Sequence, residues 1–148
     1  MKYIFLDIDG VLNNGTGSFL HKDKVSMLSH IVKTTNAKIV LISSWKDGWF
    51  KDDSSLCSHH AKAINNTFAE FGITVHDKTE DNNSWKRGKG INDYLQEKPA
   101  TQWIVLDDET FPDYNEYDIE NHWIKTAFSV GLTEDLANIA IEYLLKTE

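Results

Sequence analysis

The chain of 148 residues has a single cysteine, only two prolines and no long hydrophobic run. Cys57 has no partner for an internal disulfide, which excludes a disulfide-stapled scaffold and favours a reducing compartment. The apolar run at residues 3–6 is too short for a signal peptide, and nowhere do about eighteen apolar residues follow one another. We therefore expect a cytoplasmic protein with no membrane association.

Positive charge is also scarce, because fifteen lysines and arginines stand against twenty-three acidic residues, for a net charge of −8. A field of this sign repels phosphate backbones and anionic membranes unless a local basic site or a bound cation reverses it. The composition therefore disfavours long nucleic acids as partners without excluding them.

Short apolar runs alternate with helical periodicity, and no repeat, linker or shift in composition divides the chain. The runs that predict strands are residues 3–6, 38–42, 73–75, 102–106 and 122–125. The periods that predict helices cover residues 25–32, 57–71, 91–95 and 136–144. Gly72 is expected to stop the second helix and Thr133 to cap the last. The order βαβαβαβαβα predicts one domain over residues 1–148, a three-layer α/β fold with a mainly parallel five-stranded sheet.

Carboxylates follow two of the predicted strands, at the edge where parallel sheets form their sites. Asp7 and Asp9 come directly after the first run, and side chains two residues apart project the same way. Asp107 and Asp108 follow the fourth run. Two like charges about 4 Å apart repel by about 4 kcal/mol at an effective dielectric of about 20, so the cluster needs a cation. An all-oxygen ligand set suits Mg²⁺ better than Zn²⁺.

Hydroxyl and basic residues complete the pattern. Ser43 and Ser44 follow the second run, while Arg87 and Lys89 precede the third helical period. A metal, a serine and a cation at a helix start together indicate a site for phosphoryl transfer. The structural alternatives are Ser43 as a helix cap and the late aspartate pair as a solvated loop. The acidic stretch 113–120 lacks the glycine and spacing of a calcium loop and is expected to be solvated.

Four motifs, in order along the chain, resemble those of the haloacid dehalogenase (HAD) superfamily of phosphatases. The segment DIDGVL at 7–12 resembles motif I, IVLIS at 39–43 resembles motif II, RGK at 87–89 resembles motif III and IVLDD at 104–108 resembles motif IV. The segments LISSW at 41–45, RG at 87–88 and LDD at 106–108 are most similar to those of the small HAD domain of multi-enzyme Swiss army knife RNA-repair proteins. The resemblance implies a Rossmann-like fold. Because residues 13–21 and 43–73 leave no room for an inserted cap, we expect an open site.

The resemblance also implies a role for each matched residue. Asp7 would be the nucleophile that forms an aspartyl-phosphate, and Asp9 would protonate the leaving oxygen and then deprotonate water. Phosphate would be bound by Ser43, Ser44, Arg87 and Lys89, with Arg87 favoured over Lys89 as the motif III cation. Mg²⁺ would be held by Asp7, Asp9 through its backbone carbonyl, Asp108 directly, and Asp107 directly or through water.

We therefore expect a Mg²⁺-dependent phosphomonoester hydrolase whose substrate is a phosphorylated small molecule or a nucleic-acid end. A narrower alternative is a phosphatase of nucleotides or polynucleotide ends, in which exposed Trp45, Trp49 and Phe50 would stack on a base. A third hypothesis is a non-catalytic module that holds Mg²⁺ and binds a protein. A receiver-like phosphoacceptor is disfavoured, because only His76-Asp77-Lys78 follows the third predicted strand.

Overall fold

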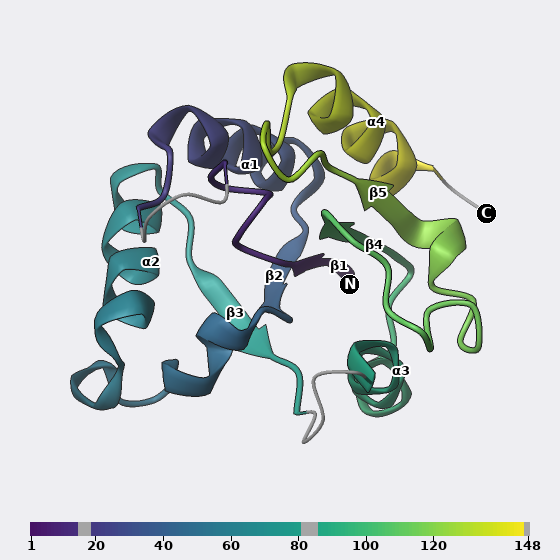
Figure 1. The fold of residues 1–148 in the computed structure, drawn as a ribbon, viewed down its shortest axis with the longest axis horizontal. Coiled ribbons are helices and arrows are strands. Elements are labelled where there is room, and N and C mark those ends of the chain that lie inside the picture. The colour runs from purple at the N-terminus through teal and green to yellow at the C-terminus, as the bar shows by residue number, and fades with distance from the viewer. Residues whose placement is uncertain (15–18, 81–85, 147–148) are drawn as a thin grey trace.

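The computed structural model describes residues 1–14, 19–80 and 86–146, which form an α/β fold around one parallel five-stranded sheet (Figure 1). The strand order is β3-β2-β1-β4-β5. The strands are β1 (Lys2–Leu6), β2 (Lys38–Leu41), β3 (Val75–Lys78), β4 (Gln102–Asp107) and β5 (Trp123–Lys125). The helices are α1 (Lys22–Thr35), α2 (His59–Glu70), α3 (Arg87–Glu97) and α4 (Glu134–Leu145). The predicted three-layer, Rossmann-like fold is confirmed.

Alternation along the strands produces two cores, one on each face of the sheet. In β1, Ile4 and Leu6 face a core shared with α1, α2 and α4, whereas Tyr3 and Phe5 face a second core shared with α3. Figure 1 shows α1 and α4 together on one side of the sheet and α3 on the other. All four residues are at most 2% exposed, as expected of a strand covered on both faces.

The predicted strands agree with the structure except for the third, which begins at Val75 rather than at Ile73. It continues through His76, Asp77 and Lys78, which are polar and half-buried. Because β3 lies at the edge of the sheet, its outer positions face solvent and tolerate polar residues. The apolar run therefore indicated only the first residue of this strand.

Helix ends follow local signals in the sequence. Thr133 caps α4 by accepting a hydrogen bond from the backbone N–H of Leu136 at 3.2 Å. After α2, Gly72 takes the left-handed conformation that stops a helix, with φ at +72°. The N-terminus of α2 differs from the prediction: it begins at His59, with Ser58 as its cap, and Cys57 lies before it in the core.

The connection from β4 to β5 is also not as predicted. The alternating order implied a helix between these strands, although no helical period was found there. Residues 108–122, all of which the structure describes, form turns and a short 3₁₀ helix instead. Tyr114 and Ile119 are at most 1% exposed and belong to the core under α3, so this connection packs on the sheet where a helix was expected. The prediction of a solvated loop over 113–120 holds for the exposed residues 115, 116, 118 and 120, but it is wrong for Asp113, Tyr114 and Ile119, which are buried.

No cap domain interrupts the described connections on the site side of the sheet. After β1 the described residues are 7–14 and 19–21, and residues 15–18 of the loop singled out in the sequence lie outside the description. Between β2 and β3 the chain forms two 3₁₀ turns and α2. Within the same described ranges, no helix combines the length and the apolar character needed to span a membrane.

Candidate active site

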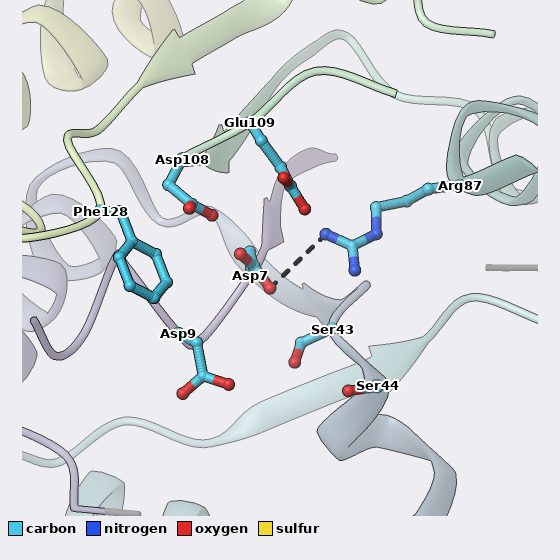
Figure 2. Close-up of a pocket in the computed structure, with 8 residues that line it drawn as sticks. All are labelled: Asp7, Asp9, Ser43, Ser44, Arg87, Asp108, Glu109 and Phe128. Carbon is cyan, nitrogen blue, oxygen red and sulfur yellow. Dashed lines mark ion pairs between the residues drawn. The ribbon is translucent and has the colours of Figure 1, made fainter. Parts of the chain in front are cut away.

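The carboxyl ends of β1, β2 and β4 meet at an open pocket of about 520 Å³ (Figure 2). These three strands are neighbours in the sheet, so the residues that follow them converge on one place. The pocket is lined by Asp7, Asp9, Ser43, Ser44, Arg87, Asp108, Glu109 and Phe128. Six of these eight were given a role in the site from the sequence. Glu109, which directly follows Asp108, and Phe128 were not.

Three carboxylates lie close together and suit a metal ion: Asp7 and Asp108 line the pocket, and Asp107 is buried beside them. One oxygen from each of Asp7, Asp107 and Asp108 lies within 4.8 Å of the other two. Burial, reinforced by the charge of Asp107, raises the pKa of Asp7 well above its usual range, against the opposing effect of Arg87. Burial also raises the pKa of Asp108. Full ionisation of this cluster is therefore unfavourable alone, and an oxygen-only donor set with excess negative charge fits a hard divalent cation.

Gly10 allows the two acidic segments to approach each other. It has φ of +81°, which favours glycine, and a Cβ atom at this position would lie 2.7 Å from Cγ of Asp108. A side chain here would push Asp108 out of its place beside Asp7. The glycine of the predicted motif I thus has a steric role as well as a conformational one.

Arg87 lies between the carboxylates of β1 and β4. Its Nη1 is 2.9 Å from Oδ2 of Asp107 and 3.5 Å from Oδ1 of Asp7. Burial alone would lower the pKa of Arg87, but Asp7 and Asp107 outweigh it and raise the pKa. The guanidinium also packs on the ring of Phe111, 4.1 Å from its centroid. These contacts leave other N–H groups of the guanidinium directed at the pocket (Figure 2).

Asp107 is fully buried, and protein groups already contact both of its carboxylate oxygens. Oδ2 accepts hydrogen bonds from Arg87 and from the hydroxyl of Tyr114, each at 2.9 Å. Oδ1 accepts one from the backbone N–H of Glu109 at 3.2 Å. Asp108, in contrast, faces the pocket. The direct ligation of a metal by Asp108 stays a prediction, with which this arrangement agrees. The contact with Arg87 gives Asp107 a second role that was not predicted, because it orients the guanidinium.

Asp113 fixes the start of α3, the helix that carries Arg87. Its carboxylate accepts hydrogen bonds from the backbone N–H groups of Gly88 at 2.9 Å and Lys89 at 2.8 Å. A Cβ on Gly88 would lie 2.7 Å from Oδ1 of Asp113, so the contact requires glycine. The acidic connection between β4 and β5 therefore sets the position of the basic motif, which no local sequence signal indicated.

Asp113→Ala is expected to destabilise the protein, because two helix N–H groups lose their acceptor. Loss of a helix cap typically costs about 1–2 kcal/mol of unfolding free energy. Urea denaturation of the variant should show this loss, while Asp113→Asn, which keeps one acceptor oxygen, should lose less. Glu116→Ala, an exposed change in the same connection, is the matched control. An unfolding free energy equal to that of the control would contradict the assigned role of Asp113.

Asp9 lines the pocket, but its carboxylate does not join the acidic trio. Oδ2 accepts a hydrogen bond from Nε1 of Trp45 at 3.2 Å, and Oδ1 accepts one from Nδ2 of Asn13 at 3.0 Å. Asn13 in turn accepts from the backbone N–H of Gly10 at 3.0 Å. Figure 2 shows the carboxylate of Asp9 directed away from Asp7. Contact between its backbone carbonyl and a metal stays a prediction.

The two serines lie at the pocket, whereas Lys89 does not. The hydroxyl of Ser43 accepts a hydrogen bond from the backbone N–H of Trp45 at 3.2 Å, so the capping alternative is confirmed, and Ser43 also lines the pocket. Ser44 is exposed there. Lys89 is exposed, and its ammonium lies 2.6 Å from Asp93. The structure thus brings Arg87, and not Lys89, to the carboxylates; phosphate binding stays a prediction.

The aromatic residues after β2 do not form the predicted stacking surface. Trp49 is only 4% exposed and donates its indole N–H to Asn65 at 3.1 Å, so its predicted exposure is wrong. Trp45 is half-buried, and its indole N–H donates a hydrogen bond to the carboxylate of Asp9. Phe50 is exposed, but it lies under the ammonium of Lys78 and outside the pocket lining.

Lys46 is a buried cation that the sequence did not reveal. It is 5% exposed, and its ammonium donates a hydrogen bond to the hydroxyl of Thr79 at 2.8 Å. Burial, with Arg87 adding to the effect, lowers the pKa of Lys46 to about 8. Because it follows Trp45 in a polar stretch, it has the sequence pattern of a solvated lysine.

Comparison with known proteins gives one family. The family model described as "HAD domain in Swiss Army Knife RNA repair proteins" matches residues 3–137, from β1 into the first turn of α4. No curated protein and no solved structure matches the chain.

Proposed function

Because the chain belongs to the family of HAD domains in Swiss Army Knife RNA repair proteins, we propose that it is a Mg²⁺-dependent phosphomonoester hydrolase acting through Asp7. The family suggests phosphatase-type chemistry. The observation that carries the proposal is the cluster of three carboxylates and Arg87 beside an open pocket. An arrangement that held the protein together without binding a ligand would not leave Asp7, Asp108 and Arg87 lining an open pocket.

Asp7 supplies the nucleophile. Its carboxylate attacks the phosphorus atom, the bond to the leaving oxygen breaks, and an aspartyl-phosphate forms on the side chain. When bound among Asp7, Asp107 and Asp108, a divalent cation supplies the positive charge that keeps Asp7 ionised and offsets its repulsion from the phosphate. The raised pKa of Asp7 without such a cation supports this dependence.

Asp9 moves the proton. It protonates the leaving oxygen and later takes a proton from the water that hydrolyses the aspartyl-phosphate. Trp45 and Asn13 hold its carboxylate at the edge of the pocket, and Figure 2 shows it on the same side as Phe128. The leaving group therefore departs on the side of Asp9 and Phe128, and not on the side of Arg87.

Arg87 and the serines hold the phosphoryl oxygens. A guanidinium has five N–H donors, so Arg87 can keep its contacts with Asp7 and Asp107 while donating to the substrate. Ser43 and Ser44 present hydroxyl groups on the adjoining wall. Because these donors are fixed before the reaction, they stabilise the charge of the transferring group without reorganisation.

The proposed substrates are nucleotides or polynucleotide ends. The family description names RNA repair, and the described residues include no cap that would enclose a small metabolite. The net charge of −8 opposes long-range attraction of a polymer. Recognition should therefore be concentrated on the terminal phosphate and its nucleoside.

The test of the proposal is metal-dependent hydrolysis. With Mg²⁺ present, the protein should hydrolyse p-nitrophenyl phosphate and at least one member of a panel of nucleotides, sugar phosphates and 3′- or 5′-phosphorylated oligonucleotides. EDTA should lower the rate at least tenfold and excess Mg²⁺ should restore it. Mg²⁺ should also raise the thermal midpoint, since a ligand at about 100 times its Kd adds about 2.7 kcal/mol to the stability of the folded state. The rise should be smaller in Asp108→Asn, which removes one carboxylate of the proposed site.

Failure of that test would have a defined meaning. A thermal shift with Mg²⁺ but no hydrolysis of any substrate would favour the non-catalytic metal-binding module. The absence of both a thermal shift and hydrolysis would contradict the metal site itself.

A further inference from the structure

Phe128 is an apolar side chain exposed at a pocket whose other lining residues are polar or charged. Its side chain is 54% exposed. Among the lining residues, which all lie in the described part of the chain, Phe128 is the aromatic one. The aromatic residues that the sequence favoured for stacking, Trp45, Trp49 and Phe50, lie outside the lining. Of these four aromatic residues, Phe128 is therefore the one that a planar group of a ligand in the pocket can contact.

Phe128 stands on a tight turn between β5 and α4. The backbone N–H groups of Val130 and Gly131 both donate to the carbonyl of Ala127, at 2.9 and 2.7 Å. Gly131 has φ of +82°, and a Cβ there would lie 2.8 Å from the carbonyl oxygen of Val11. The turn therefore closes on itself and packs against the loop after β1 without room for another side chain.

Long-range hydrogen bonds tie both ends of this turn to the catalytic segments. The hydroxyl of Thr126 donates to the carbonyl of Gly10 at 2.6 Å, and its backbone N–H donates to the carbonyl of Asp107 at 3.1 Å. Beyond the turn, the backbone N–H of Leu132 donates to Val11 at 2.7 Å. The backbone of the turn that carries Phe128 is thus held at a fixed position relative to the segments that carry Asp7 and Asp9, which is what a recognition surface requires.

We propose that Phe128 is a specificity-determining residue that stacks on the nucleobase of the phosphate ester bound at Asp7. The proposal rests on the phosphatase function and names its substrate class. Phe128 lies on the side of Asp9, where the leaving group departs, and away from Arg87, where the phosphate is held (Figure 2). Every base has a flat apolar face, so one aromatic ring accepts any terminal nucleotide without reading its sequence.

The experiment compares kcat/KM for a base-bearing and a base-free substrate. Wild type, Phe128→Ala, Phe128→Trp and Val130→Ala are assayed with adenosine monophosphates, a phosphorylated oligonucleotide, a phosphotyrosine peptide and glycerol phosphate. In Phe128→Ala the preference for adenosine monophosphate over glycerol phosphate should fall about tenfold or more, mainly through KM, because stacking contributes to binding before and during the reaction. Phe128→Trp should retain the preference.

Val130→Ala is the matched control, because Val130 is 48% exposed on the same turn but does not line the pocket. It should show the wild-type preference. An equal loss for all substrates in Phe128→Ala would indicate a structural role and overturn the proposal. An unchanged preference would overturn it too, as would a phosphotyrosine peptide turned over in preference to every nucleotide.

Two further arms separate the possible outcomes. A larger effect of Phe128→Ala on the oligonucleotide than on the mononucleotide would identify a polynucleotide end as the source of the base, and the reverse would identify a free nucleotide. If wild type hydrolyses nothing, the proposed function fails, and calorimetric binding of adenosine monophosphate with Mg²⁺ decides the inference. Binding about tenfold weaker in Phe128→Ala than in Val130→Ala would support it, and equal binding would overturn it.

Discussion

Asp7→Asn is expected to lower kcat for phosphate-ester hydrolysis by on the order of 10³-fold or more. Asparagine has nearly the same shape but no negative charge, so it cannot form the acyl-phosphate bond. Turnover of p-nitrophenyl phosphate measures the loss. Mass spectrometry after acid quenching should detect a phosphorylated side chain in the wild type and none in the variant. Turnover equal to that of the wild type would remove Asp7 as the nucleophile.

Two controls separate chemistry from folding. Asp9→Asn should also turn over slowly, yet it should still become phosphorylated by p-nitrophenyl phosphate, whose leaving group needs little help from an acid. Asp7→Asn should not unfold the protein. Because the pKa of Asp7 is raised in the folded state, its ionisation without metal destabilises that state as the pH rises above the ordinary aspartate range. The variant lacks this penalty, so its thermal midpoint should exceed that of the metal-free wild type by more at pH 8 than at pH 5.

Arg87→Ala is expected to lower kcat/KM by on the order of 10²- to 10³-fold, since it removes the main cation of the pocket. It also leaves Asp7 and the fully buried Asp107 without their partner, which typically costs about 3–5 kcal/mol of stability. Arg87→Lys should retain part of the activity, because the charge remains while the paired N–H contacts and the packing on Phe111 are lost. Phosphatase assays and urea denaturation of the same samples separate the two effects.

Lys89→Ala is the matched control for Arg87. Both residues lie in the first turn of α3, but Lys89 is exposed and paired with Asp93. It should lose only an exposed surface ion pair, with little effect on stability because solvent screens such pairs, and it should keep its activity. Activity that survives in Arg87→Ala and disappears in Lys89→Ala would reverse the assignment of the motif III cation.

The central part of the fold and the cluster of Asp7, Asp107 and Asp108 were predictable from the sequence for the same reason. Strands β1 and β4 are buried on both faces, so they appear as uninterrupted apolar runs that end directly before Asp7 and Asp107. Parallel pairing of neighbouring strands then brings their ends together. The edge strand β3 was displaced by two residues in the prediction because three of its four positions are polar and half-buried.

The walls of the site depend on contacts between residues far apart in the chain, and these have no local signal. Whether Arg87 or Lys89 faces the carboxylates is decided by Asp113, which fixes the start of α3 from 25 residues away. Trp49 is buried because α2 covers it and supplies Asn65 as a partner. Phe128 reaches the pocket because Thr126 bonds to Gly10, 116 residues earlier. A residue pattern shows which chemistry is present, but such contacts decide which side chains take part.

The pairing of β1 with β4 joins residues about a hundred positions apart, from Lys2 with Gln102 to Leu6 with Leu106. Closing so large a loop costs entropy before any contact repays it, so this step is slow compared with the formation of the local helices. During synthesis, Asp7 emerges about a hundred residues before Asp107 and Asp108, and it acquires them and Arg87 only when β4 docks beside β1. The nascent chain therefore has no competent centre until the sheet is nearly complete, and the onset of activity would report on the last stage of folding.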